Sequence, residues 1–158
     1  MVLLSPKFPS VSESSHAIEI RLRGIPAPQG SKQITKWGMR EASNKVGPWR
    51  QTASAQAAMQ YTGPVLTDPV RVQIEFIMPR AKHHWSTAKG KEDQLKPSAP
   101  PDDHCTVGGD IDKLTRACLD SLAVRSGGSV LKDDSLVVKL RVDKRYAGFD
   151  EPSGASVR

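Results

Sequence analysis

The stretch VRVQIEFIM, residues 70–78, constrains the fold of this chain more than any other segment. Apolar residues occupy every second position from Val70 to Met78, and mostly polar residues stand between them. Successive side chains of a β-strand point to opposite faces of a sheet. The alternation therefore predicts a strand with one buried face, which Pro79 ends.

Four other segments carry regular patterns. Residues 17–25 (AIEIRLRGI) and 136–146 (LVVKLRVDKRY) alternate in the same way and predict two more strands, with Val138, Leu140 and Val142 on one face of the second. Residues 48–61 are rich in alanine and begin with proline, which favours a helix. Residues 110–123 predict an amphipathic helix, whose buried face is expected to hold Leu114, Ala117, Cys118, Ser121 and Leu122.

The order of these segments predicts an α/β fold in one domain. Two helices lie between three strands, an order that favours a small mixed β-sheet with both helices packed on one face. We expect the domain to span residues 16–150, after a disordered tail at 1–15 and before a tail at 151–158, in which one more short strand has room. Residues 31–47 are predicted to be mobile or ligand-facing, and residues 80–109 to form a long irregular loop.

The composition indicates a globular protein with an anionic partner. The 158 residues carry a net charge of +6, which points to nucleic acid before other partners. Only two cysteines are present, so a disulfide-dense secreted domain is not indicated, and the reducing cytoplasm is the expected location. No apolar run reaches 18 residues, so no membrane association is predicted.

Acidic residues nevertheless gather at two places in this basic chain. Asp110 and Asp112 stand at the start of the second helix, and Asp133 and Asp134 precede the last strand. Acids at a helix start can simply cap free N–H groups, and acids before a strand can form a polar turn. The turn RSGGSVLK does not fix which end of the helix the strand meets. If the two acidic starts meet, three or four carboxylates converge, and a divalent cation would relieve their repulsion.

The spaced combination of these residues resembles the RusA family of Holliday junction resolvases, which are common in phages and prophages. The resemblance rests on Asp110 and Asp112, on Arg116 four positions after Asp112, and on the segment LDSL that begins at Leu119. It continues with Asp133–Asp134 and Val137–Val138. Upstream, the segment GIPAPQGSK is similar to the phage branch of the family.

The resemblance implies an endonuclease and its site. Asp110, Asp112 and Asp134 would hold Mg²⁺, for which Mn²⁺ can substitute, with Asp133 as a neighbouring or fourth carboxylate. Arg116 would complete the catalytic group. The family acts as a homodimer and nicks two strands of a four-way DNA junction symmetrically, in DNA recombination and repair. If a phage or prophage encodes it, its setting is the bacterial cytoplasm.

Two positions depart from the best-known family members, which have Asn after the second Asp and Lys at the basic position. Here these are Lys113 and Arg116. Arginine stays protonated, so Arg116 can clamp a phosphate but cannot exchange a proton. The expected DNA contacts are Lys113, Arg116, Lys32, Lys144 and Arg145.

Three other segments contain residues that can bind ligands. The spacing of His83, His84, His104 and Cys105 fits no standard zinc pattern. The segment KHHWS is either a solvated loop or a DNA contact in which Trp85 stacks on a base. PQGSK suits a turn and lacks the full phosphate-binding loop, so no nucleotide cofactor is expected.

Two other classes of protein compete with a nuclease. A phosphatase with Asp110 as nucleophile needs a buried strand directly before it, and PPDDHCTVGG is not one. A non-catalytic basic DNA-binding phage protein, in which the acids only cap a helix, predicts DNA binding that survives EDTA and no cleavage with any metal.

Overall fold

The computed structural model describes residues 17–30, 32–41 and 44–158. The tail expected at residues 1–15 lies outside this part. The helices and strands are, in order, β1 (Ile20–Arg23), β2 (Lys32–Thr35), β3 (Gly38–Glu41), α1 (Val46–Gln60), β4 (Val70–Met78), α2 (Ile111–Leu122), β5 (Val137–Tyr146) and β6 (Gly154–Val157), with short 3₁₀ turns η1 (Lys82–His84), η2 (Val124–Ser126) and η3 (Asp134–Leu136).

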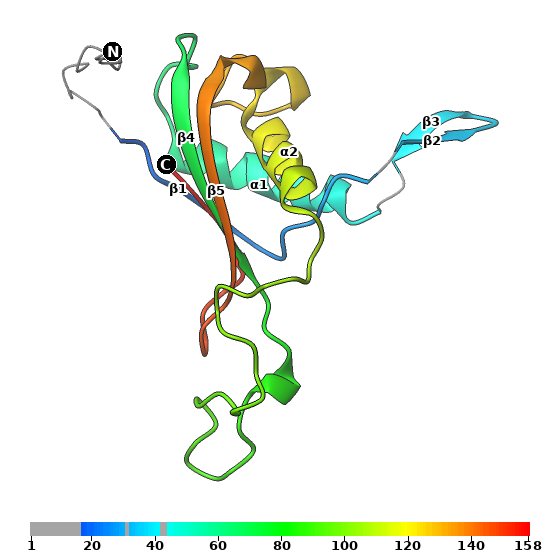
Figure 1. Ribbon diagram of the computed structural model, residues 1–158. Coiled ribbons are helices and arrows are strands. Elements are labelled where there is room, and N and C mark those ends of the chain that lie inside the picture. Colours follow the sequence, from blue (N-terminus) through cyan, green and yellow to red (C-terminus); the bar gives the residue numbers. More distant parts are fainter. Residues whose placement is uncertain (1–16, 31, 42–43) are drawn as a thin grey trace, which may run out of the picture.

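Four strands form a mixed sheet in the order β1-β6-β4-β5 (Figure 1). β4 and β5 are parallel, whereas β6 is antiparallel to both β1 and β4. Both helices lie on the same side of this sheet, with α1 packed against α2 and β1. The predicted α/β fold, with two helices on one face of a small mixed sheet, is therefore confirmed.

The C-terminal boundary expected at residue 150 is too early. Residues 154–157 form β6, which lies between β1 and β4 rather than in a tail. Gly154 shows how closely the strands approach, because a Cβ built there would lie 2.0 Å from the backbone oxygen of Leu22 in β1. The Gly- and Pro-containing sequence before β6 hid a strand of only four residues.

The core fills the space between the sheet and the helices. Ile74, Phe76 and Met78 of β4 are at most 1% exposed, as the alternation predicts. All five residues predicted for the buried face of α2 are buried, and Thr115 and Leu119 are buried with them. α1 turns small residues inward: Ala53 and Ala57 are fully buried, which lets the two helices approach closely.

The alternation of β5 is interrupted at its start. The pairing with β4 shifts between Val70 and Arg71, so Val137 faces Val70 while Lys139 faces Arg71. Val137 packs against the core, whereas Val138, which falls at this shift in the pairing, is 66% exposed. A register irregularity of this kind moves side chains to the other face, and strict alternation does not reveal it.

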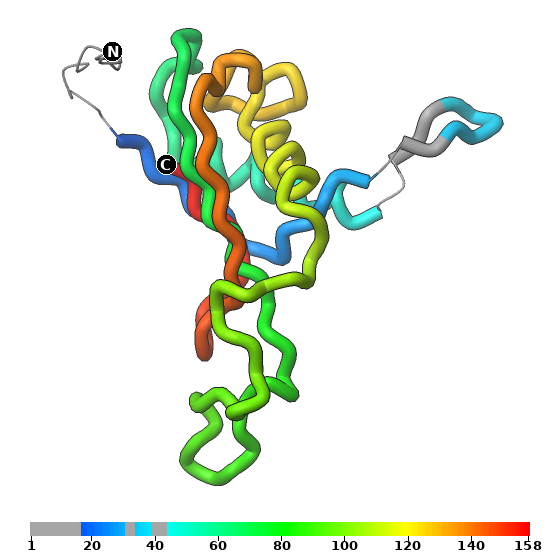
Figure 2. Tube along the Cα trace, in the orientation of Figure 1, coloured from blue at the N-terminus to red at the C-terminus, as the bar shows by residue number. Residues whose placement is uncertain are grey.

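Two segments project from this body. Residues 79–109 form a long loop beyond the end of the sheet, and β2 and β3 form a separate hairpin that points away from the helices (Figures 1 and 2). The segment 31–47, predicted to be mobile or ligand-facing, thus contains a two-stranded sheet. Within the described ranges, no helix is both long enough and apolar enough to cross a membrane.

Candidate active site

The start of α2 is held in place by the two glycines before it. Gly108 and Gly109 have φ angles of +84° and +99°, a region that side-chain-bearing residues rarely adopt. A Cβ on Gly108 would collide with Met78, and one on Gly109 would lie 2.6 Å from Pro28. The glycines therefore let the chain pass between β4 and the segment after β1, and this passage fixes the position of Asp110 at the N-cap.

The same segment after β1 also contacts α2 directly. The backbone N–H of Gln29 donates to the carbonyl oxygen of Lys113 at 3.2 Å. GIPAPQGSK and the acidic helix, the two pieces of sequence that carried the family resemblance, therefore lie against each other.

One shallow pocket of about 430 Å³ brings residues of α2 and β5 together with one of the predicted acids of η3. Asp112 and Arg116 line it from α2, and Asp134 lines it from η3. Its remaining wall is formed by Ile111, Thr115, Leu119, Leu140 and Val142. Three of the four residues predicted to be catalytic therefore share a pocket.

The strand β5 runs antiparallel to α2. The residues leading into β5 bridge to the end of the helix, through Ala123 and Leu131. Further along β5, Lys144 donates from Nζ to the carbonyl oxygen of Gly109, just before the helix. The acidic start of β5 therefore does not meet the acidic start of α2, and Asp134 approaches the later turns of the helix.

Asp110, the fourth predicted catalytic residue, does not line the pocket. Its Oδ2 lies 2.9 Å from Nζ of Lys113, one turn further along the helix, and its side chain is 67% exposed. The ammonium of Lys113, by hydrogen bond and charge, lowers the pKa of the Asp110 carboxyl. Lys113, expected to contact DNA, is thus paired with an expected metal ligand.

Asp133 also has a local partner. Its Oδ1 accepts a hydrogen bond from the backbone N–H of Ser135 at 2.9 Å, which caps η3, and Arg125 lies 3.8 Å from its other oxygen. The hydrogen bonds from Ser135 are the main cause that lowers the pKa of Asp133. This carboxylate holds the turn that carries Asp134.

The donor set of the pocket fits a hard cation. Among the described residues no group of three or more His, Cys, Asp or Glu side chains gathers closely enough to hold a metal ion. Magnesium needs fewer protein ligands, since it is commonly bound by one or two carboxylates and completes its octahedron with water and phosphate oxygens. Asp112 lines the pocket from the first turn of α2, and Asp134 lines it from η3 beside the later turns, so the two carboxylates lie toward different ends of the pocket, with Arg116 one turn beyond Asp112.

Asp120 also belongs to this region, and the sequence did not single it out. Asp120 lies 3.6 Å from Arg50 of α1, with its side chain only 19% exposed. Burial is the main cause that raises the pKa of Asp120, and the nearby charge of Asp134 raises it further. Asp120 therefore joins α2 to α1.

The remaining predicted DNA contacts lie apart from the pocket. Nζ of Lys144 is bonded to the carbonyl oxygens of Val107 and Gly109, so it steadies the passage before Asp110. Arg145 is bound by two carboxylates, those of Glu75 and Glu151. Lys32 begins β2, and its side chain lies outside the part of the structure that is described.

The Arg145–Glu151 pair predicts how stability depends on pH. The guanidinium lowers the pKa of Glu151 to about 2, from a usual value of 4.5. The stabilisation is therefore complete above pH 4.5 and is lost as the pH falls toward 2. Such a shift corresponds to roughly 3 kcal/mol, and solvent screening of a pair that is about one-third exposed leaves about 1–2 kcal/mol.

Urea unfolding at pH 6 and pH 2.5 measures this effect. The loss of unfolding free energy between the two pH values should be about 1–2 kcal/mol smaller in Glu151→Gln than in the unchanged protein. Glu92→Gln is the matched control, because Glu92 accepts backbone hydrogen bonds in the exposed loop and has no arginine partner there. Equal pH dependence in all three proteins would contradict the prediction.

The aromatic residues of the 79–109 loop pack against the body of the protein. The guanidinium of Arg80 lies 4.4 Å from the ring centre of Tyr146 and pairs with Asp102. Trp85 packs edge-on against Phe149 at 5.4 Å. These contacts give Trp85 a structural role at the base of the loop, and they favour the interpretation of KHHWS as a loop that does not stack on DNA.

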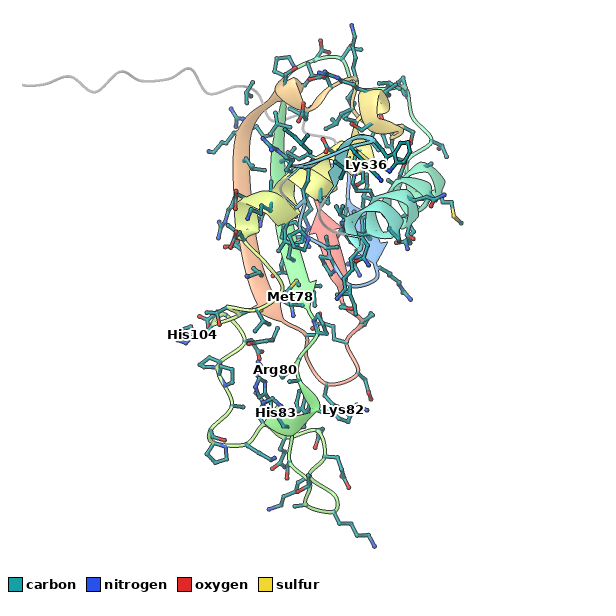
Figure 3. All side chains as sticks on the ribbon, turned by 90° about the vertical axis from the view of Figure 1, so that its right-hand side faces the viewer. Lys36, Met78, Arg80, Lys82, His83 and His104 are labelled. Carbon is teal, nitrogen blue, oxygen red and sulfur yellow. The ribbon has the colours of Figure 1, made fainter. Side chains whose placement is uncertain are left out.

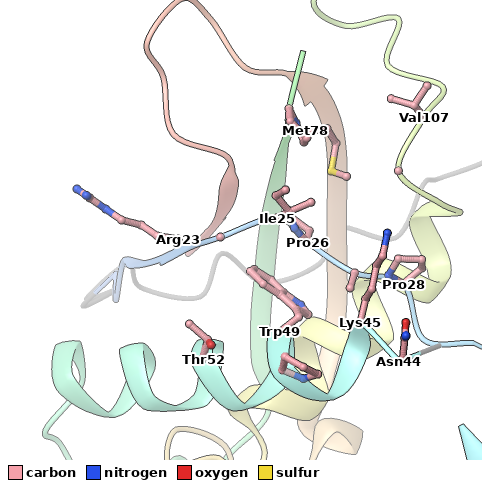
Figure 4. A pocket seen from close by; sticks show the side chains of 15 residues that line it. Arg23, Ile25, Pro26, Pro28, Asn44, Lys45, Trp49, Thr52, Met78 and Val107 are labelled. Carbon is pink, nitrogen blue, oxygen red and sulfur yellow. The ribbon is translucent and has the colours of Figure 1, made fainter. Parts of the chain in front are cut away.

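A second pocket, of about 840 Å³, lies between the segment after β1 and the start of α1 (Figure 4). Its wall includes Ile25, Pro26, Trp49 and Met78, with Arg23 and Lys45 at its margin. No carboxylate or imidazole lines it. Of these two pockets, only the smaller one on α2 is lined by carboxylates.

Fold and site together define a small mixed α/β domain in which Asp112 and Arg116 of α2 and Asp134 of η3 line one pocket. The model of the endodeoxyribonuclease RusA family matches residues 24–152, which is most of the chain. The chain belongs to the RusA family and is an endodeoxyribonuclease of the Holliday junction resolvase class. No curated protein matches it.

Proposed function

We propose that this endodeoxyribonuclease resolves four-way DNA junctions by Mg²⁺-dependent hydrolysis, as a homodimer that places one nick in each of two opposed strands. The observation that carries the proposal is the shared pocket of Asp112, Asp134 and Arg116. A two-fold dimer presents two such pockets in symmetric positions, and symmetric nicks require this arrangement.

Within each pocket, Asp112 and Asp134 are the proposed ligands of the metal ion. Bound Mg²⁺ would polarise the scissile phosphate and supply an activated water. Asp110 joins the ligands when its side chain leaves Lys113, a change that costs little because both side chains are about half exposed or more. Asp133 contributes by fixing η3, and so the position of Asp134.

The basic side chains handle the phosphate. Arg116 lines the pocket and presents a planar guanidinium suited to two phosphate oxygens. Lys113, released from Asp110 in the same step, would hold a neighbouring phosphate. Lys144 acts by holding the Gly108–Gly109 passage, and Lys32 contributes charge from the hairpin. Because Arg145 is occupied by two carboxylates, we assign it no DNA contact.

The setting we propose is the cytoplasm of a bacterial cell, with a phage or prophage as the source suggested by GIPAPQGSK. Cys105 and Cys118 are both buried and unbridged, which suits a reducing compartment.

Cleavage of a labelled four-way junction tests the proposal. We expect paired, symmetric nicks with Mg²⁺, fewer or none on a linear duplex of the same sequence, and none in EDTA. Mn²⁺ should support the reaction. Junction binding in EDTA without cleavage in any divalent metal would contradict the proposal, and so would equal cutting of junction and duplex.

A further inference from the structure

The β2–β3 hairpin is a projecting element of which the proposed function uses only the charge of Lys32. Its strands pair with each other in register from Lys32–Glu41 to Thr35–Gly38 and belong to no larger sheet. In Figure 1 it extends to one side of the helices, and in Figure 3 it points toward the viewer with Lys36 labelled. A two-stranded hairpin is only marginally stable alone. We therefore expect that a binding partner contacts and stabilises this one.

The end of the hairpin exposes two large apolar side chains. Trp37 is 87% exposed and Ile34 is 88% exposed. Single exposed apolar residues are common on protein surfaces. A tryptophan and an isoleucine together at the end of a projecting hairpin are different, because the body of the domain offers them no cover.

The turn holds the indole at the tip. The hydroxyl of Thr35 donates to the carbonyl oxygen of Gly38 at 2.8 Å, and the backbone N–H of Trp37 donates to that hydroxyl at 3.3 Å. Gly38 takes a φ of +112°, which closes the turn at the next residue. The position of Trp37 is therefore set by the backbone.

A positive charge accompanies the ring. Nζ of Lys36 lies 5.2 Å from the centre of the Trp37 ring, within the range of a cation–π contact. The hairpin sequence KQITKWGMRE contains three basic residues and one acidic residue. An aromatic plane next to a cation is the combination that proteins use to stack on an unpaired base and hold the adjoining phosphate. A protein partner would explain the apolar tip but not the basic excess.

We propose that the hairpin tip contacts DNA at the branch point, with Trp37 stacked on a base that branching leaves unstacked and Lys36 against the neighbouring phosphate. The inference rests on the proposed function, because only a branched substrate offers such a base to a protein that must not cut ordinary duplex. Inside a linear duplex every base is covered on both faces, and the indole finds no free surface. The hairpin thereby favours junctions over duplex before any bond is cut.

Binding measured in EDTA tests the proposal without any contribution from cleavage. The probes are a four-way junction with 2-aminopurine at the branch point, the same junction with 2-aminopurine inside one arm, and a linear duplex. Stacking of one base on an aromatic side chain corresponds to roughly five- to one-hundred-fold in affinity. We expect Trp37→Ala to weaken junction binding by this factor, to change duplex binding less than about twofold, and to lose the fluorescence change at the branch point.

Two variants serve as controls. Trp37→Phe keeps an aromatic face and should retain most of the junction affinity. Met59→Ala removes an apolar side chain that is 82% exposed on α1 and should bind as the unchanged protein does. Thermal unfolding of all variants should be the same, because Trp37 contributes nothing to the core.

Equal junction affinity of Trp37→Ala and the unchanged protein overturns the proposal. A Trp37→Ala protein that sediments as a monomer where the unchanged protein is a dimer also overturns it, since the tip would then be a protein contact. Both results are independent of cleavage. If the unchanged protein binds the junction through Trp37 but never cuts it, the proposed hydrolysis is contradicted, whereas the proposed contact of the hairpin with DNA is supported.

Discussion

Asp112→Asn should abolish junction cleavage while leaving junction binding intact. The substitution keeps the size of the side chain and removes one of the two carboxylates that line the pocket on α2. A bound metal ion contributes several kcal/mol of transition-state stabilisation, so the cleavage rate should fall by roughly a thousandfold or more. Loss of a negative charge beside DNA should leave binding in EDTA unchanged or slightly tighter.

Asp143→Asn is the matched control for this change. Asp143 lies on β5, like Leu140 and Val142 of the pocket wall, but its partner is Arg141 at 3.3 Å and it is 51% exposed. It should retain cleavage close to that of the unchanged protein. Asp134→Asn should behave as Asp112→Asn does. Full cleavage activity of Asp112→Asn in Mg²⁺ would show that the pocket is not the active site. The carboxylates would then have only structural roles in the helix and the turn.

Phe76→Ala should cause the largest loss of stability among simple truncations of the sheet. Phe76 is fully buried in the middle strand β4, where β5 and β6 flank it. Removing a buried phenyl ring costs the lost burial and leaves a cavity, together about 3–5 kcal/mol. That is a large part of the roughly 5–15 kcal/mol that stabilises a typical domain.

Phe149→Ala gives the comparison for the same chemical change. Phe149 is 48% exposed and packs against Trp85 at the base of the long loop. Its truncation should cost about 1 kcal/mol, the value of one aromatic pair. Urea unfolding followed by tryptophan fluorescence measures both variants. A loss below about 1 kcal/mol for Phe76→Ala would mean that the core is not closed around β4.

The parts of the fold that follow a strong local pattern could be predicted from the sequence. The alternation from Val70 to Met78 and the five apolar or small positions of α2 both reflect burial against one neighbour, and both were confirmed. The sequence left room for β6 but did not locate it, because four residues with two small side chains carry almost no pattern. Its place between β1 and β4 is decided by pairing with distant strands.

The candidate site, like the fold, could be predicted only in part from the sequence. The residue types and their spacing singled out Asp112, Asp134 and Arg116, which the pocket brings together. The sequence left open whether β5 meets the start or the end of α2, and the antiparallel arrangement decides it. Asp110 and Asp133 turn to Lys113 and to the N–H of Ser135, partners that depend on side-chain and turn geometry.

The place of β6 in the sheet has a consequence for how the protein is made. Among the strands that the structure describes, β1 pairs only with β6, and β6 comes last of these strands in the sequence. Pairing between such distant segments is slow to form because a long loop must close first. Until β6 has paired, β1 lacks its partner strand and β4 lacks one of its two, so the sheet behind the acidic pocket stays open. We therefore expect the pocket to reach its final shape only after this strand has joined the sheet.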